Sequence, residues 1–216
     1  MGIRYHIERA GELPDVDPRL LLIQKPSTGW PPLEEEELES RLAVIRNSST
    51  LEQLRNQPDI AAYRQFYWRL RIDPTKRRPS AEALVRRIIA GKPFPRINPI
   101  VDRYNLISAE NRISIGALST DYLSDTKLTM RMAQQNEPFL GIGFPEPKPC
   151  TGQELVLSVA DQIIALYPYR DSHNTRIRGD DSAVLFTLCE VPGIEESQIE
   201  MAAQSLKSEF SQRGQL

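Results

Sequence analysis

Apolar residues recur with two different periods along the chain, and the change of period separates predicted strands from predicted helices. Alternation over Ile3–Glu8 predicts a half-buried strand, and Leu20–Gln24 predicts a second. Helical spacing then dominates residues 34–111. The predicted helices are Glu34–Arg46, a helix that begins at Pro58 and ends before Asp73-Pro74, one with Ser80 as N-cap and Gly91 as its stop, and Ile100–Asn111.

The second half of the chain changes to short apolar or alternating runs that Gly, Pro, Asp and Asn separate, as is typical of strands. Helical spacing resumes only in Glu195–Phe210. These patterns predict a mixed α/β (α+β) fold with helices packed on a mostly antiparallel sheet. We expect an extension, residues 1–56, packed on a core domain, residues 57–216. The predicted strands are Ile113–Leu118, Leu128–Ala133, Phe139–Ile142, Leu155–Ser158, Gln162–Leu166 and Ala183–Val191.

Composition agrees with a folded globular chain, since 40% of the 216 residues are hydrophobic and 26% are charged. No apolar run approaches the roughly 20 residues that a membrane span needs, and the first residues lack a signal-peptide core, so we expect a cytoplasmic protein. Cys150 and Cys189 are far apart and outside any metal motif, so we expect no disulfide, metal or cofactor. Phe144-Pro145 breaks the phosphate-binding pattern after Gly141-Ile142-Gly143, which favours a tight turn.

Charge is distributed unevenly, although the net charge is only −2. Residues 64–96 contain ten Lys or Arg and only two acidic residues, a local balance of +8. The loop Thr75–Ser80 places three cations beside a predicted helix N-terminus, where free backbone N–H groups suit phosphate. The alternative is a solvated basic turn, but the charge of the surrounding segment favours a polyanion partner. The acidic run of residues 34–39 is interpreted as the solvated face of a helix, in preference to an acidic binding tail.

Two polar clusters are candidate sites. Arg170–Thr175 lies between two apolar strands, where Asp, Ser, Thr and His side chains can orient a hydroxyl or water. From spacing alone, a polar hairpin loop is the favoured interpretation of this run. Asn98, Asp102 and Asn105 fall at i, i+4 and i+7, a polar stripe on an otherwise apolar helix. That stripe either hydrogen-bonds internally, which is the common case, or lines a pocket.

With these residues in view, the chain resembles the B3/B4 domain of the phenylalanyl-tRNA synthetase β subunit, and more closely the free-standing B3/B4 domain proteins. Residues 73–80 with Ala83-Leu84 look like the signature of the free-standing proteins. Residues 97–102 with Asn105 look like the I-N-x-[IV]-V-D-x-x-N stretch shared with the synthetase, and Gly116-Ala117 and Asp121 continue the register. The resemblance spans roughly Tyr63 to Val191.

The resemblance implies a stand-alone editing hydrolase that binds the acceptor end of a tRNA and hydrolyses a mischarged aminoacyl ester. Such proofreading answers a physical need, because one binding pocket discriminates similar amino acids only modestly. Gly116 stands where the synthetase motif has its editing-site His, and Ser119 stands in place of the first Asp of the following turn. Hydrolysis would therefore use a water oriented by polar groups and no covalent nucleophile, with His173 a possible base, although a solvent-facing loop histidine is the favoured interpretation of that residue.

The implied roles fall into three groups. Asn98, Asp102, Asp171, Ser172 and Thr175 are the predicted catalytic residues; Asn105, Gly116 and Arg170 are predicted to bind substrate; Lys76, Arg77, Arg78, Arg86 and Arg87 are predicted to bind RNA. Two alternatives stay open. One is a non-catalytic RNA-binding module that keeps the basic surface, and the other is a pocket for a free amino acid or another small carboxylate.

Overall fold

The computed structural model of the chain describes residues 4–16 and 18–211. Six α-helices and one short 3-10 turn lie within these residues, and none of the helices is long and apolar enough to cross a membrane. They are α1 (Glu35–Ser48), α2 (Leu51–Arg55), α3 (Pro58–Arg69), α4 (Ser80–Ile89), α5 (Pro99–Asn111), the 3-10 turn η1 (Thr120–Tyr122) and α6 (Glu196–Ser211).

The strands form three sheets. The first has the order β1-β4-β7-β8-β9, with β1 parallel to β4 and every other pair antiparallel; the second is the antiparallel sheet β2-β10-β3; the third is the pair β5-β6. The predicted mixed α/β fold with mostly antiparallel sheets is confirmed. The strands are β1 (His6–Arg9), β2 (Arg19–Gln24), β3 (Ile115–Ser119), β4 (Lys127–Met132), β5 (Gln135–Phe139), β6 (Lys148–Thr151), β7 (Leu155–Val159), β8 (Gln162–Leu166), β9 (Arg170–Asp171) and β10 (Ala183–Leu188).

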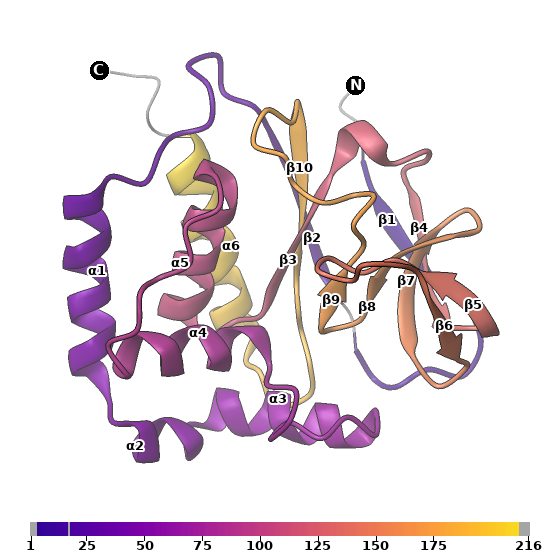
Figure 1. The fold of residues 1–216 in the computed structure, drawn as a ribbon, viewed down its shortest axis with the longest axis horizontal. Helices are drawn as coiled ribbons and strands as arrows, with labels where there is room; N and C mark the ends of the chain where they lie inside the picture. Colours follow the sequence, from indigo (N-terminus) through magenta and orange to yellow (C-terminus); the bar gives the residue numbers. More distant parts are fainter. Residues whose placement is uncertain (1–3, 17, 212–216) are drawn as a thin grey trace.

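The elements stack in layers from left to right in Figure 1. Helices α1, α4, α5 and α6 lie on one side of the sheet β2-β10-β3, and the larger sheet lies on its other side (Figure 1). Helix α3 runs across the lower end of both sheets in this view. Strands β1 and β2 come from the predicted extension, and they hydrogen-bond to β4 and β10 respectively as edge strands.

The helical layer packs on the three-stranded sheet through a cluster of aromatic side chains. Phe186 of β10 stacks on Phe210 of α6, and Trp30 meets the edge of Phe210, each with ring centroids 5.5 Å apart. The buried Trp30 indole N–H donates to the Asp181 carbonyl at 2.8 Å, so its polar atom is satisfied. This cluster fixes α5 and α6 against β10.

A second cluster fills the space between the five-stranded sheet, the three-stranded sheet and α3. Leu118, Leu128 and Leu185 are almost completely buried there and come from different strands. The Tyr63 hydroxyl of α3 donates to the Cys189 carbonyl at 2.5 Å and accepts from the Ser114 N–H at 3.2 Å. Helix α3 is therefore tied to the ends of β10 and β3, the two strands that border the cavity described below.

The acidic helix α1 joins the fold through ion pairs, so the interpretation of its acidic run as a solvated face was wrong in part. Glu37 pairs with Arg41 at 3.1 Å and with Arg103 at 3.0 Å. Arg103 lies on α5, is only 1% exposed and also pairs with Glu209 of α6. A guanidinium removed from water needs such partners. The network therefore connects α1, α5 and α6.

Most predicted elements are present, but several local assignments were wrong. Helix α2 and strands β6 and β9 were not predicted. The predicted strand Phe139–Ile142 is shifted: β5 ends at Phe139, and residues 140–142 instead hydrogen-bond to residues 171–173. Ser80 is the first helical residue of α4, and the N-cap is Pro79. Residues 1–3, where the first predicted strand begins, lie outside the described chain.

Candidate functional site

A cavity of about 170 Å³, called the central cavity here, lies between strand β3, helix α5 and the segment that connects β8 to β9. Its walls are mostly apolar on the side of β7 and β8 and polar on the side of α5 and β9. It is lined by Ser80, Tyr104, Asn105, Ser114, Ile115, Gly116, Leu118, Leu157, Ala165, Leu166, Tyr167, Pro168, Tyr169, Arg170, Asp171, Thr187 and Cys189. An apolar pocket with a few convergent polar groups is the usual form of a ligand site.

Asp171 is the acidic side chain of the central cavity. Strand β9 pairs with the edge of β8, placing Asp171 opposite Ala165, and the carboxylate reaches across to β3. There Oδ2 accepts a hydrogen bond from the Ala117 N–H at 3.3 Å. Burial raises the pKa of Asp171 to about 6, although this hydrogen bond and the charge of Arg170 act in the opposite direction. A carboxyl group with this pKa exchanges a proton near neutral pH, which suits acid–base chemistry.

Gly116 provides the space that the Asp171 carboxylate occupies. A Cβ at this position would lie 3.2 and 3.3 Å from the two Asp171 carboxylate oxygens and 2.5 Å from the Thr187 hydroxyl oxygen. Any side chain here would displace Thr187 or Asp171. The glycine therefore allows β9 to approach β3 at the wall of the central cavity.

Two other titratable groups of the cavity, Cys189 and Tyr104, stay protonated near neutral pH. Burial raises the pKa of the Cys189 thiol to about 12, so it is not a thiolate nucleophile. Burial, with smaller contributions from the charges of Asp171 and Asp102, raises the pKa of the Tyr104 hydroxyl well above its usual value. Tyr104 is thus a hydrogen-bond donor at the wall, and Asp171 is the group that titrates.

The basic loop, residues 73–79, meets the cavity at Tyr169. The Asp73 carboxylate holds the loop by accepting from the Thr75 N–H at 2.8 Å and from its hydroxyl at 2.7 Å. The Arg77 guanidinium lies over the Tyr169 ring, 4.3 Å from its centroid, and Tyr169 lines the cavity. Lys76 and Arg78 are exposed beside it. The predicted RNA-binding loop and the predicted ester pocket are therefore adjacent.

Two other predicted RNA-binding residues are directed elsewhere. Arg86 lies 3.9 Å from the fully buried carboxylate of Glu82, which also pairs with Arg64 at 2.7 Å. Arg87 is exposed, but its Nε donates to the Pro93 carbonyl at 2.5 Å. Part of the local charge of +8 therefore serves to hold α3 to α4 and to close the end of α4, while the three cations of the loop are exposed.

The predicted stripe on α5 divides between two roles. Asn105 lines the central cavity, whereas Asn98 is the N-cap of α5 and accepts from the Val101 N–H at 3.0 Å. Asp102 is buried, and its carboxylate accepts from the Ile97 N–H at 2.6 Å and from Arg96 at 2.8 Å. Neither Asn98 nor Asp102 lines the cavity, so their prediction as catalytic residues is not supported: their oxygens hold the start of α5.

The polar run after β8 also divides. Arg170 and Asp171 line the cavity, whereas Ser172 and Thr175 are buried outside its lining. The Ser172 hydroxyl oxygen accepts from the Asn174 N–H at 3.2 Å, and the Thr175 carbonyl accepts from the Ser119 N–H at 2.9 Å. Neither side chain lines the cavity, so the structure does not bring Ser172 and Thr175 to the central cavity, and their catalytic role stays a prediction.

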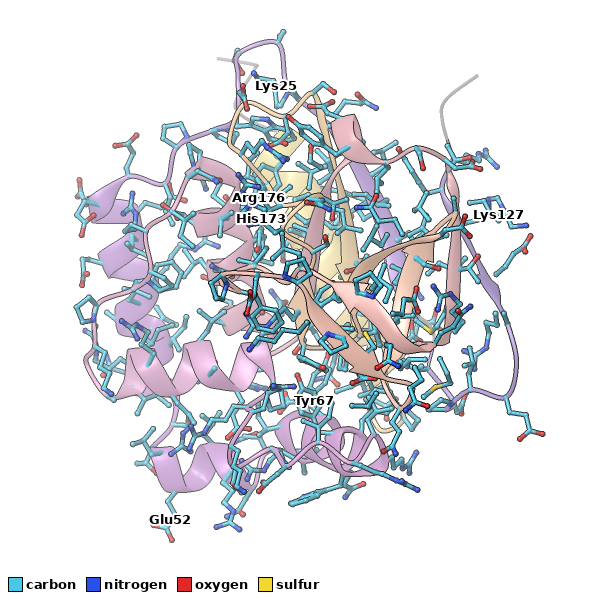
Figure 2. All side chains as sticks on the ribbon, turned by 45° about the vertical axis from the view of Figure 1, so that its right-hand side comes forward. Lys25, Glu52, Tyr67, Lys127, His173 and Arg176 are labelled. Carbon is cyan, nitrogen blue, oxygen red and sulfur yellow. The ribbon has the colours of Figure 1, made fainter. Side chains whose placement is uncertain are left out.

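His173 lies beside Arg176 (Figure 2), which donates to the His173 carbonyl at 2.8 Å. It is half-buried and does not line the cavity. The structure therefore does not support His173 as the base.

Sequence reasoning missed several residues of the site. Two of them could have been found from the sequence. Tyr104 directly precedes Asn105 in the quoted motif, and Thr187 is the one hydroxyl residue in the apolar strand β10. Tyr169 and Cys189 carry no such signal, because only tertiary packing brings them to the cavity. Within residues 4–16 and 18–211, no group of His, Cys, Asp or Glu side chains is arranged to hold a metal ion.

Comparison with known proteins identifies one family. The model of the B3/4 domain matches residues 62–215. Among solved structures, an N-terminal fragment of the phenylalanyl-tRNA synthetase β-subunit from Pyrococcus horikoshii is similar, with 15% identity and a TM-score of 0.44. The match covers 54% of this chain and 40% of that one, so the chain spans less than half of that fragment. The search of curated proteins gave no match.

Proposed function

Since the chain belongs to the B3/4 domain family, we propose that it binds the acceptor end of an aminoacyl-tRNA and hydrolyses the ester of a wrongly attached amino acid. One observation carries the proposal: a half-buried carboxyl group, Asp171, whose pKa of about 6 suits a general base, lines a small cavity that adjoins an exposed basic loop. Ester hydrolysis on RNA needs both features, a base for water and cations for phosphate.

The proposed reaction needs one water and no covalent intermediate. Above about pH 6 the ionised Asp171 accepts a proton from the water, whose oxygen attacks the ester carbonyl carbon. The bond from this carbon to the ribose oxygen then breaks, and the proton passes to that oxygen. The products are a free amino acid and a tRNA with its terminal hydroxyl restored. Tyr104 and Asn105, on the same wall, supply donors for the carbonyl oxygen.

The size of the cavity supports an amino-acid moiety as its occupant. Drug-sized ligands occupy pockets of roughly 300–1,000 Å³, and this cavity of about 170 Å³ is smaller. We therefore propose that the amino acid enters it, while Lys76, Arg77 and Arg78 hold the RNA backbone outside.

A non-catalytic tRNA-binding module is the second candidate. Two observations favour it: neither histidine of the chain lines the cavity, and the only thiol there has a raised pKa. In that case the basic loop would bind RNA and Asp171 would have no reaction to perform.

The test is deacylation of a panel of mischarged aminoacyl-tRNAs, with tRNA binding measured in parallel. Asp171→Ala should abolish hydrolysis and retain binding, whereas Asp161→Ala, which removes an exposed carboxylate in the turn before β8, should leave both unchanged. Arg77→Glu should weaken binding and reduce its dependence on salt. Binding without hydrolysis of any ester would reject the hydrolase in favour of the second candidate, and absence of both would reject a tRNA-related role.

A further inference from the structure

A second cavity, also about 170 Å³, adjoins the central one. It lies between the end of α3, the basic loop and the turn from β6 to β7. Tyr167 and Tyr169 line both cavities, so these side chains form the wall between them. Neither the family match nor the sequence motifs assign a role to this space.

Two arginines face the second cavity, Arg71 from the end of α3 and Arg77 from the basic loop. Arg71 Nη1 lies 3.4 Å from the Gln153 amide oxygen, and Arg77 lies over the Tyr169 ring. Within the described part of the chain, neither guanidinium is at ion-pair distance from a carboxylate. Arg64, Arg96 and Arg103, by contrast, each have an acidic partner.

The backbone at Arg71 makes its side chain more notable. Arg71 has φ of 57°, the left-handed conformation in which a helix commonly ends and which favours glycine. An arginine therefore stands where the backbone alone favours a residue without a side chain. This backbone conformation is energetically unfavourable for arginine, and the Arg71 side chain that it carries lines the second cavity.

The acidic side chain of the second cavity, Glu154, is already engaged. Its oxygens accept from the Thr151 N–H and hydroxyl, both at 2.9 Å, and from the Gln153 N–H at 3.2 Å. These bonds hold the turn between β6 and β7 and orient the carboxylate toward its own backbone. The cavity thus presents two arginines without a carboxylate partner among the described residues, one carboxylate hydrogen-bonded within its own turn, and the Tyr169 ring with Arg77 over it.

We infer that the second cavity receives the phosphate of the terminal nucleotide of the RNA on Arg71 and Arg77, while the ribose and base, too large for a space of about 170 Å³, extend beyond it beside Tyr169. This inference rests on the proposed function, because it places the nucleotide beside the amino acid in the central cavity. Paired guanidinium groups suit a phosphate, and an aromatic ring suits an unstacked base. Because Tyr167 and Tyr169 line both cavities, the phosphate and the amino acid would bind in neighbouring spaces on the two sides of these residues.

The experiment uses adenosine 5′-monophosphate as a small probe, inorganic phosphate as a second probe, and titration calorimetry of the full chain. Arg71→Gly is the informative variant, because glycine suits the left-handed backbone. It should keep or raise the melting temperature while weakening nucleotide binding about tenfold or more, the loss of one charge-assisted contact. Arg69→Gly is the matched control: Arg69 is exposed, two residues away and outside the lining. It should lower the melting temperature through helix propensity and retain nucleotide affinity.

The outcomes separate this inference from the proposed function. Nucleotide binding that Arg71→Gly weakens, together with a raised KM for deacylation, supports it. Equal affinity of the wild-type protein for the nucleotide and for inorganic phosphate would overturn the nucleotide assignment, as would an Arg71→Gly variant that binds like wild type. Hydrolysis with an unchanged KM in that variant would leave the proposed function intact and reject the second cavity. Nucleotide binding without hydrolysis of any ester would support the second cavity as a binding site and reject the hydrolase.

Discussion

Replacing Asp171 by asparagine should stabilise the fold at neutral pH, although it removes the proposed base. The pKa of Asp171 is raised from 3.8 to about 6 in the folded chain, because burial disfavours the carboxylate. A shift of about two units corresponds to roughly 3 kcal/mol at ~1.4 kcal/mol per unit. Below pH 4 both states are protonated and this penalty is absent. Between about pH 4 and 6 the unfolded state releases its proton first, so the free energy of unfolding falls as pH rises.

The measurement is urea unfolding of wild type and Asp171→Asn at half-unit steps from pH 4 to pH 8. The stability difference should be smallest near pH 4 and should grow in favour of the variant by up to about 3 kcal/mol at pH 7. Asparagine keeps an oxygen that can accept from the Ala117 N–H, so the cavity wall is preserved. Asp161→Asn, at an exposed turn, serves as the control. A variant less stable than wild type at pH 7, or a difference that does not change with pH, would refute the reasoning.

Two further substitutions test the site and the scaffold separately. Gly116→Ala should lower kcat/KM for deacylation by roughly 10- to 100-fold, because its Cβ would lie 2.5 Å from the Thr187 hydroxyl and close to Asp171; unchanged kinetics would show that the close approach is unimportant. Arg103→Met should cost about 3 kcal/mol in urea unfolding, since Glu37 and Glu209 each lose an arginine partner, although both keep Arg41, and the Pro31 carbonyl loses its donor. Arg19→Met, which breaks ion pairs to exposed glutamates of α6, should cost no more than about 1 kcal/mol, and equal losses would contradict this distinction.

Periodic segments of the sequence predicted the fold well. The apolar positions of the closing helix lie at helical spacing, β10 is a short continuous apolar run, and both elements form where these patterns occur. Strand β9 was missed because it has only two residues and exists through its pairing with β8. No local pattern identifies such an element. Asp171 was therefore placed in a loop, although its strand pairing is what brings it to the cavity.

The errors at the site come from side chains that bond to nearby backbone. Asn98 precedes Pro99, and an Asn followed by Pro at the first helical position is an N-cap signal that outweighs the i, i+4, i+7 stripe. The Asp102 carboxylate accepts hydrogen bonds from Ile97 and Arg96, which precede α5. The position of Asp102 along the helix therefore does not predict which groups its side chain contacts. Local polar contacts of this kind compete with pocket-lining roles.

The charge count over residues 64–96 was limited for a different reason, because a sum of charges ignores pairing. Arg64 and Glu82 are distant in sequence but meet between α3 and α4, and their contact removes a cation from the surface. Arg71 and Arg77 come from the same segment and have no such partner among the described residues. Only the three-dimensional arrangement distinguishes a structural arginine from one available to a ligand.

The central cavity lies between the five-stranded and the three-stranded sheet. This position links the chemistry of the cavity to the stability of the fold. Asp171 of β9 belongs to one sheet and the Ala117 N–H belongs to the other, so their hydrogen bond bridges the gap. Gly116 permits the bridge, and the apolar wall of β7 and β8 removes water from it. The same burial raises the pKa of Asp171 and lowers the stability of the ionised fold. The pKa that the proposed reaction needs and the stability that the fold loses when Asp171 ionises therefore have the same physical cause.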